Sequence, residues 1–300
     1  MKTEFRSYVC IFIAGSLWGT IGLFVKLMEQ AGSTSSYTSF LRMGLGLILL
    51  VIITLAKDGP KAFRIGKGTL LSCILLGFIC QAIYNLAYSN AVNTIGVSLS
   101  SVLLYTSPIF TSVISFLFFH EKLGRRKLFA LLINIIGCTL TVTGGNFNGL
   151  SFAASGLLFG IAAGFCYSLA PIFGRLAADE GSPFAVSTYN FLFATIFLAI
   201  FTHPWTTVSN PLNLKVLAIG VGFALVPTAL GYIFYFSGLK NITESSKVPV
   251  VASIETVVAT IIGILVFHEN LRLGNILGIV CVLGSIAIMN LNFRQSSRPS

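Results

Sequence analysis

The residue best placed to do chemistry is Glu255, the one carboxylate near the middle of the apolar residues 246–269. About 20 apolar residues suffice for a helix to cross a bilayer, so Glu255 is expected near the middle of the membrane. An ionisable group at that depth costs about 2.5–3.5 kcal/mol on insertion scales and usually faces a protein interior or a watery cavity. Glu255 could hold a substrate ammonium or carry a proton. Alternatively, its carboxyl group could be protonated or hydrogen-bonded and hold neighbouring helices together.

Three more residues near mid-membrane are candidates for lining a binding cavity. Trp18 and Tyr167 lie at equivalent places in two similar segments. Buried Trp and Tyr need partners for their N–H and O–H groups, which a polar cavity supplies. Simple helix packing against neighbouring glycines is the alternative. Ser107 precedes Pro108, whose missing N–H bends a helix and frees a carbonyl, so Ser107 is expected to line the cavity or to bond back to its own helix.

Catalytic and metal-binding motifs are missing from the sequence. We find no Walker sequence, Gly-rich phosphate loop, CxxC pair or nucleophile elbow. The two Phe-His-Glu sequences, at 119–121 and 267–269, lack the second histidine of a zinc protease, because Gly124 and Arg272 stand in its place. We therefore expect no metal, no cofactor and no enzyme activity, and we interpret both sequences as helix ends.

The composition indicates a chain whose solvent is lipid. Of 300 residues, 55% are hydrophobic and 9% are charged, whereas roughly a quarter are charged in a soluble domain. Residues 68–120 and 128–174 form runs of 53 and 47 residues without a single charge. Each run is about twice as long as one membrane span. These features predict an all-α membrane protein with many spans.

Apolar length and breaker residues predict ten transmembrane helices. Their predicted bounds are 8–28, 37–56, 69–91, 95–119, 127–145, 152–176, 184–202, 214–238, 243–267 and 273–292. The connections are short, and only the C-terminal tail, RQSSRPS, is predicted to be disordered.

The distribution of Lys and Arg predicts the orientation. With the N-terminus on the cytoplasmic side, that side holds fifteen of the 19 Lys and Arg residues and the other side holds four. Because Lys and Arg accumulate in cytoplasmic loops, both termini are predicted to be cytoplasmic in a multi-pass protein of the cytoplasmic (inner) membrane. The same bias explains the net charge of +10 without a nucleic-acid partner.

The two halves of the chain repeat. Residues 13–27 align with residues 162–176, and the Phe-His-Glu at 119–121 recurs 148 positions later. We therefore predict a first repeat over residues 1–147 and a second over 148–300. Five spans are an odd number, so the second repeat enters the membrane from the opposite face. Such inverted repeats underlie alternating access to a site between the halves.

The chain resembles the ten-helix EamA-type family of the drug/metabolite transporter superfamily. The resemblance is carried by SLWGTIGLF at 16–24, by Ser107-Pro108, by the two Phe-His-Glu sequences and by Glu255. Family members often have Glu-Pro where this chain has Glu255-Thr256. The resemblance implies an inner-membrane carrier of small metabolites that works without ATP and often exports amino acids or related compounds.

Further candidates lie toward the ends of the expected pathway. Tyr84, Asn85 and Tyr88 share one helical face in the outer half of the third span. Tyr232 and Tyr235 fall in the inner half of the eighth span. One set at each end of the pathway would suit gates or the lining of the cavity; an interfacial aromatic belt is the alternative.

One basic residue lies within a predicted span close to the outer face. Arg42, one turn inside that face, could bind a substrate carboxylate, or it could snorkel or pair with Glu29.

Together these features predict a secondary transporter that moves a small organic metabolite, plausibly an amino acid or amine-bearing compound, by alternating access, with export as the expected direction. A passive facilitator or channel is the main alternative, followed by an intramembrane enzyme. The expected partners are the substrate and the lipid bilayer, with protons as a candidate coupling ion and a monomer or homodimer as the assembly.

Overall fold

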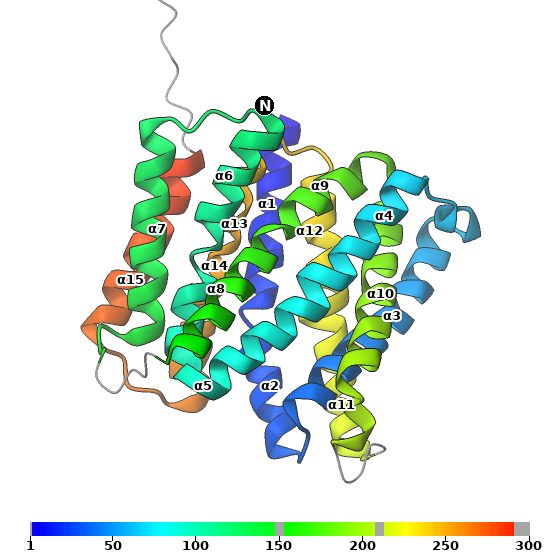
Figure 1. Ribbon diagram of the computed structural model, residues 1–300, viewed down its shortest axis with the longest axis horizontal. Helices are drawn as coiled ribbons and strands as arrows, with labels where there is room; N and C mark the ends of the chain where they lie inside the picture. Colours follow the sequence, from blue (N-terminus) through cyan, green and yellow to red (C-terminus); the bar gives the residue numbers. More distant parts are fainter. Residues whose placement is uncertain (1, 148–152, 208–212, 291–300) are drawn as a thin grey trace, which may run out of the picture.

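The computed structural model describes residues 2–147, 153–207 and 213–290. The tail predicted to be disordered lies outside these residues. All regular structure in the described residues is helical, and the chain folds into an elongated bundle (Figure 1). The first half contains α1 (Lys2–Trp18), α2 (Ile21–Gln30), α3 (Ser35–Lys57), η1 (Pro60–Phe63), α4 (Lys67–Leu75), η2 (Leu76–Ile83), α5 (Tyr84–Leu104), α6 (Ser107–Phe119) and α7 (Arg125–Thr143).

The second half follows the same order. It contains α8 (Ala154–Ser168), α9 (Ala170–Glu180), α10 (Pro183–Thr202), η3 (Pro204–Thr206), α11 (Leu214–Phe223), η4 (Ala224–Leu230), α12 (Gly231–Leu239), η5 (Ser245–Lys247), α13 (Val248–Ala252), α14 (Ile254–Phe267) and α15 (Leu273–Asn290).

The described chain crosses the bundle ten times. Nine helical segments are long and apolar enough to span a membrane, and α6 is a shorter apolar helix. The longest segment, Lys67–Leu104, changes direction at Gly96, whose φ of 81° and ψ of 164° interrupt the helix. Because L side chains rarely adopt that conformation, glycine suits the turn. The third span therefore ends at Gly96, and the fourth runs from there through α6.

The outer surface of the bundle is apolar, as expected of a protein surrounded by lipid. Phe118 on α6 and Leu265 on α14 expose 73% and 71% of their surface, and many other large apolar side chains do the same. Exposed apolar surface on this scale indicates contact with a membrane rather than with water. We call the face where the N-terminus lies the N face and the opposite one the far face (Figure 1).

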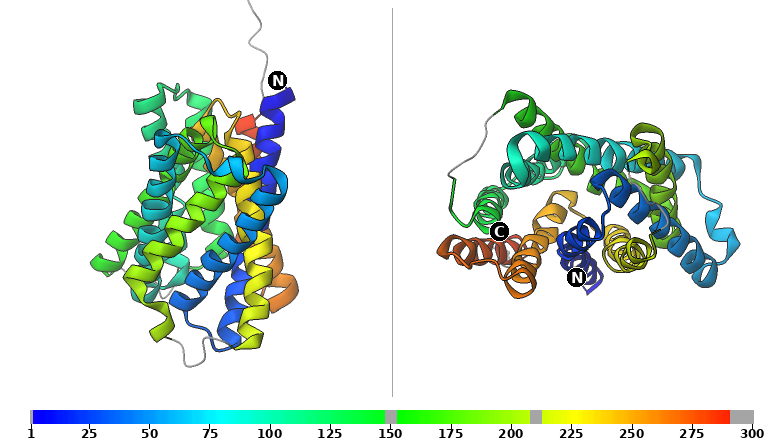
Figure 2. Two further views of the ribbon diagram at one scale, coloured as in Figure 1. Left: turned by 90° about the vertical axis from the view of Figure 1, so that its right-hand side faces the viewer. Right: turned by 90° about the horizontal axis from the view of Figure 1, so that it is seen from below.

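Equivalent helices of the two repeats pack against each other. Helix α7 contacts α15 at one end of the bundle, and α3 contacts α10 at the other (Figure 2, right). Between these pairs, α1 packs against α12 and the broken ninth span, while α8 packs against α5 and α6. The centre of the bundle is therefore built from both repeats.

Six of the spans have irregular backbones at their centres, and the irregularities occur in repeat-related pairs. The first span breaks after Trp18 and the sixth, its repeat equivalent, after Ser168. The fourth span breaks before Ser107 and the ninth before Ile254. The third and eighth spans contain the π-helical segments η2 and η4. Interrupted helices of this kind surround the midplane sites of inverted-repeat transporters. The inverted repeat is thus visible in the backbone as well as in the sequence.

Prolines accompany these irregularities. Pro108 and Pro171 occupy the first turns of α6 and α9, directly after a break, and Pro227 lies inside η4. The ninth span breaks at Ser253 although it lacks the Glu-Pro of the family. There Pro249, in the first turn of α13, is the nearest proline. Thr111 donates a hydrogen bond of 2.9 Å to the carbonyl of Ser168, so protein satisfies part of the interrupted backbone.

Glycines bring the breaks close to neighbouring helices. A Cβ added to Gly15 would lie 2.6 Å from the carbonyl oxygen of Ala252, and one added to its repeat equivalent Gly164 would lie 2.8 Å from the carbonyl oxygen of Leu103. Small residues at helix crossings allow such approaches in membranes. The first span therefore packs on the broken ninth span as the sixth packs on the fourth.

Gly19 offers a direct test of this packing. An added Cβ would lie 2.5 Å from the Cβ of Val258 and 2.8 Å from the carbonyl oxygen of Glu255, whereas Gly22 on the next turn has nothing within 4 Å. Because backbone atoms cannot move aside, Gly19→Ala should destabilise the protein by about 1–3 kcal/mol, as overpacking does. Gly22→Ala should leave the melting temperature of the purified protein at the wild-type value or raise it. Equal melting temperatures for the two variants would contradict this packing.

Candidate functional site

Two narrow cavities meet at the centre of the bundle, where the interrupted spans converge. Tyr167, Pro249 and Ala252 line both cavities. The first is also lined by Trp18, Cys80, Gln81, Tyr84, Ala170, Pro171, Tyr232, Tyr235 and Val248, and the second by Tyr105, Ser107, Pro108, Asn134, Ser253 and Glu255. Of the ten residues proposed from the sequence, the structure brings seven to these cavities. Asn85, Tyr88 and Arg42 do not line them.

The first cavity has aromatic walls. The ring of Trp18 lies 5.1 Å from that of Tyr232 and 5.0 Å from that of Tyr235, and the rings of Tyr84 and Tyr167 lie 5.6 Å apart. These separations are typical of interacting aromatic pairs. The indole nitrogen of Trp18 is buried and makes no hydrogen bond to any described residue, so it is available to a ligand or to water in the cavity.

Gln81 lines the first cavity but was not among the residues selected from the sequence. It lies within the π-helical segment η2, and its amide nitrogen donates a hydrogen bond of 2.8 Å to the hydroxyl of Tyr232. A π-helical turn shifts the helical register and is frequent at functional sites. A polar amide in the middle of an apolar span was the available signal, and it was outweighed by the tyrosines that follow it.

Tyr84 and Tyr232 lie in the same cavity, although the sequence predicted two sets at opposite ends of a pathway. Tyr84 directly follows η2 and Tyr232 follows η4, so both are closer to the middle of their spans than the span lengths suggested. In this conformation both tyrosines therefore line one cavity instead of lying at separate ends of a pathway.

Asn85 and Tyr88 contact neighbouring backbone and side chains instead of lining the cavity. Asn85 donates to the carbonyl of Gln81 at 2.6 Å and accepts from the hydroxyl of Ser39 at 3.4 Å. The hydroxyl of Tyr88 shares a hydrogen bond of 2.9 Å with that of Ser101, and its ring stacks on Tyr84. Tyr88 thus supports Tyr84, while Asn85 faces the second span.

Glu255 lies in the first turn of α14, directly after the break at Ser253. It lines the second cavity together with Tyr105 and Ser107. Among the described residues its carboxylate has no hydrogen-bond or ion-pair partner. The amino end of a helix carries partial positive charge, so this position favours a carboxylate electrostatically. The carboxylate is therefore available to a cationic ligand or to a proton.

Arg42 supplies a positive charge that interacts with Glu255. Its guanidinium lies 5.3 Å from the ring centre of Phe223, and its Nε atom is buried without a hydrogen-bond partner. The ion pair with Glu29 that the sequence suggested is not formed in the described structure. Arg42 and Glu255 act electrostatically on each other, and both act on the hydroxyls of Tyr84 and Tyr232. Although Arg42 lines neither cavity, these four groups therefore lie within electrostatic range of one another.

A buried polar cluster holds the break of the ninth span. The amide nitrogen of Asn134, which is fully buried, donates to the hydroxyls of Ser253 at 2.6 Å and Ser285 at 3.0 Å. These bonds join α7 and α15 to the break beside Glu255. Asn134 was not selected from the sequence because one uncharged polar residue in a span has many structural explanations.

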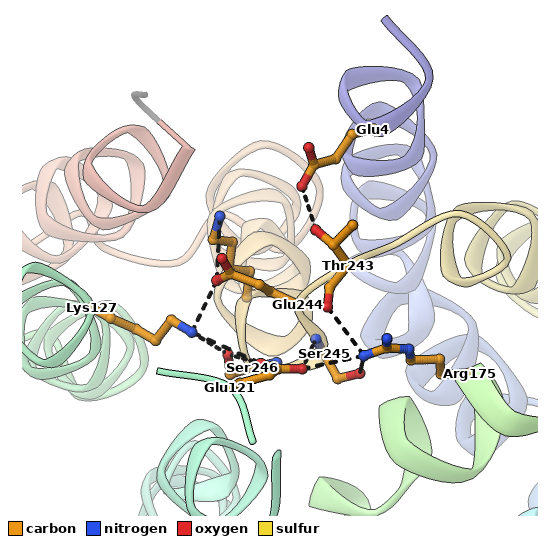
Figure 3. A network of polar contacts seen from close by, with 9 residues as sticks. Glu4, Glu121, Lys127, Arg175, Thr243, Glu244, Ser245 and Ser246 are labelled. Atoms are coloured by element: carbon orange, nitrogen blue, oxygen red, sulfur yellow. Dashed lines mark hydrogen bonds and ion pairs between the residues drawn. The ribbon is translucent and has the colours of Figure 1, made fainter. Parts of the chain in front are cut away.

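A charged network lies at the N face (Figure 3). Its centre is Glu121, which is only 7% exposed. One carboxylate oxygen accepts from the backbone N–H of Ser245 at 2.7 Å, and the other accepts from the N–H and hydroxyl of Ser246 at 3.2 and 2.5 Å. Arg175 and Lys127 lie 3.4 and 3.8 Å from these oxygens. From its sequence position Glu121 is only part of a helix end.

Lys127 extends this network. Its ammonium donates to the hydroxyl of Ser246 at 2.8 Å and pairs with Glu244 at 2.9 Å, while Lys247 pairs with Glu244 at 3.4 Å. Burial opposes ionisation of Glu244, but the two lysines outweigh it and hold the pKa of that carboxyl below its usual value. The network joins the ends of the fourth and sixth spans to the start of the ninth.

Comparisons with known proteins agree with this architecture. The model of the EamA-like transporter family matches residues 5–143 and again residues 154–291. An uncharacterised transporter of Archaeoglobus fulgidus is 28% identical over 278 residues, covering 93% of this chain and 94% of the relative. The uncharacterised inner membrane transporter YicL of Salmonella typhimurium is 25% identical and covers 99% of both chains. A protein of known crystal structure has the same fold, with a TM-score of 0.75 at 18% identity over 95% of this chain and 96% of that one.

Proposed function

This chain belongs to the EamA-like transporter family, and from that premise we propose that it is a secondary transporter of a small zwitterionic metabolite, an amino acid or a close relative. It is a multi-pass membrane transporter, as its relatives and apolar helices indicate. We place its N face in the cytoplasm of a bacterial-type inner membrane, because that orientation puts fifteen of 19 Lys and Arg residues on the cytoplasmic side. Export is the proposed direction.

The observation that carries the substrate proposal is that two opposite charges, each with unsatisfied hydrogen-bonding atoms among the described residues, lie within electrostatic range of each other. Glu255 has no partner among the described residues, and the Nε of Arg42 is buried without one. Charges removed from water are costly unless they are paired or hydrogen-bonded. A zwitterion would satisfy both, with its ammonium at Glu255 and its carboxylate at Arg42. Trp18, Tyr84 and Tyr232 would then pack against the rest of the substrate.

The small size of the two cavities supports alternating access rather than a channel. In this conformation they have room for water but not for an amino acid. Substrate entry therefore requires the two repeats to move relative to each other, as inverted-repeat transporters do. The midplane breaks provide the places where spans can bend.

A flux experiment tests the proposal. The purified protein is reconstituted into liposomes loaded with one unlabelled amino acid, and uptake of the labelled compound is followed for each amino acid in turn. Saturable counterflow of at least one zwitterionic compound is the expected result. Counterflow of none, or non-saturable leakage as through a channel, would refute the proposal. Repeating net flux with and without a pH gradient shows whether a proton is exchanged, since flux insensitive to the gradient removes that role.

A further inference from the structure

The two Phe-His-Glu sequences form equivalent helix ends at opposite faces. His120 and His268 adopt left-handed conformations, with φ of 54° and 55°, and end α6 and α14. The backbone N–H of Glu121 donates to the carbonyl of Ser115 at 3.2 Å, and that of Glu269 donates to the carbonyl of Gly263 at 3.1 Å. The repeat has therefore preserved the local fold at both ends.

Each of these ends also carries an equivalent cation. The guanidinium of Arg175 lies 4.5 Å from the ring centre of Phe119 at the N face, and the ammonium of Lys26 lies 3.7 Å from that of Phe267 at the far face. Arg175 and Lys26 are themselves repeat equivalents, 149 positions apart. Both faces therefore hold an aromatic ring, a cation and a carboxylate in the same order.

The two carboxylates differ sharply in their surroundings. Glu121 is buried and accepts hydrogen bonds from the backbone at the start of the ninth span. Glu269 is exposed, and its carboxylate has no hydrogen-bond or ion-pair partner among the described residues. A shift of 148 positions carries Ser245 and Ser246 onto Val97 and Ser98 at the start of the fourth span. There Val97 is 61% exposed and Ser98 half-buried.

We propose that this difference is the difference between a closed and an open gate. In the state seen here, Glu121 binds the start of the ninth span and closes the N face. In the opposite state, Glu269 binds the N–H groups of Val97 and Ser98 and closes the far face. Lys26 then plays the part that Arg175 plays at the N face. At the same time, the contacts of Glu121 break and the N face opens. The first N–H groups of a helix have no intrahelical partner, so a carboxylate satisfies them at either face. The inference rests on the alternating access of the proposed function.

The composition of the two gates indicates which one is stronger. Lys127 and Glu244 reinforce the N-face gate, and their repeat equivalents are Asn275 and Gly96, which bring no charge. The far-face gate therefore lacks equivalents of three ion pairs, those of Lys127 with Glu121 and Glu244 and that of Lys247 with Glu244. Two states that exchange similar contacts differ little in free energy, and this asymmetry favours closure of the N face in the absence of substrate.

Hydrogen–deuterium exchange of the protein in lipid nanodiscs tests the gate. In the wild type, amides of residues 244–247 should exchange slowly and those of residues 96–99 quickly. Glu121→Gln should speed exchange at 244–247 by at least about tenfold, because hydrogen bonds to charged groups contribute about 1.5–3 kcal/mol. The same variant should slow exchange at 96–99, because the population moves to the state in which the far face is closed. Adding Glu269→Gln to Glu121→Gln should abolish that slowing.

Glu4→Gln is the matched control. Glu4 lies at the same face and accepts a hydrogen bond of 2.6 Å from Thr243, but it has no counterpart in the proposed far gate. It should leave exchange at 96–99 unchanged. If Glu121→Gln speeds exchange at 244–247 and leaves 96–99 unchanged in a variant with a wild-type melting temperature, Glu121 is only a local helix cap and the proposal fails. Because the readout contains no substrate, that failure would leave the proposed substrate untouched, and a failure of the flux experiment would leave the coupled gates intact.

Discussion

Glu255→Gln should reduce substrate counterflow by at least about tenfold, since a hydrogen bond to a charged group contributes about 1.5–3 kcal/mol. The substitution keeps the shape of the side chain and removes only its charge. Counterflow exchanges one substrate molecule for another and requires no net proton movement. Its loss would therefore assign Glu255 to the substrate ammonium, whereas loss of pH-driven flux with intact counterflow would assign it to a proton.

Folding of this variant should not suffer. The carboxylate of Glu255 has no partner among the described residues, so Gln leaves no group unsatisfied that was satisfied before, and removing a charge from the membrane interior is favourable. The melting temperature should equal or exceed that of the wild type. Glu29→Gln, the same change at an exposed acid on α2, should leave counterflow unchanged. Wild-type counterflow together with wild-type pH-driven flux in Glu255→Gln would refute the site.

Arg42→Gln should raise the KM for carboxylate-bearing substrates by about 10- to 100-fold, because a bound carboxylate would lose a charge-assisted partner. An amine that lacks the carboxylate should be transported equally by the variant and the wild type. Arg42→Lys should restore part of the affinity, since Lys keeps the charge but not the two-pronged geometry of the guanidinium. The measurement is counterflow over a range of substrate concentrations for an amino acid and its decarboxylated analogue.

Lys215→Gln is the control for Arg42→Gln. Lys215 is an exposed cation at the start of α11, on the same side of the predicted topology, and lines neither cavity. Its substitution should change neither KM value. If Arg42→Gln weakens transport of the amino acid and of its decarboxylated analogue equally, the guanidinium acts on the shape or field of the site and not on the carboxylate.

The paired irregularities connect the fold to this chemistry. In uninterrupted helices, all backbone groups at mid-membrane would be hydrogen-bonded within the helix. Only side chains could then interact with a ligand at the centre of the bundle. Here the break at Ser253 puts Glu255 in the first turn of a helix, and the break after Trp18 puts its indole against Tyr232 and Tyr235. The same breaks allow glycines such as Gly19 to meet backbone oxygen atoms. Site and hinge therefore occupy the same few residues.

Much of the architecture was predictable from the sequence because its physical causes are local. A span needs a certain length of apolar residues, so ten crossings could be predicted with ends close to those observed; the first predicted span, 8–28, lies within the observed Glu4–Gln30. Five spans per repeat require inversion by parity alone. A lone carboxylate such as Glu255 is conspicuous in an apolar stretch wherever its neighbours lie. The fold and the existence of a central acid followed from these features, while the family was indicated by the resemblance of its motifs.

Other properties were decided only by the tertiary structure, since they depend on contacts between distant residues. Glu121 is a helix end by sequence, and its burial depends on Ser245 and Ser246, more than 120 positions away. Tyr84 and Tyr232 looked like opposite ends of a pathway because span lengths do not reveal π-helical turns at the centre. Pairing with Glu29 was one of the roles open to Arg42, but folding placed it over Phe223 and in the field of Glu255. Whether a segment can span the membrane depends only on residues that are neighbours in the sequence. Which group pairs with a buried charge depends on how distant helices pack against each other.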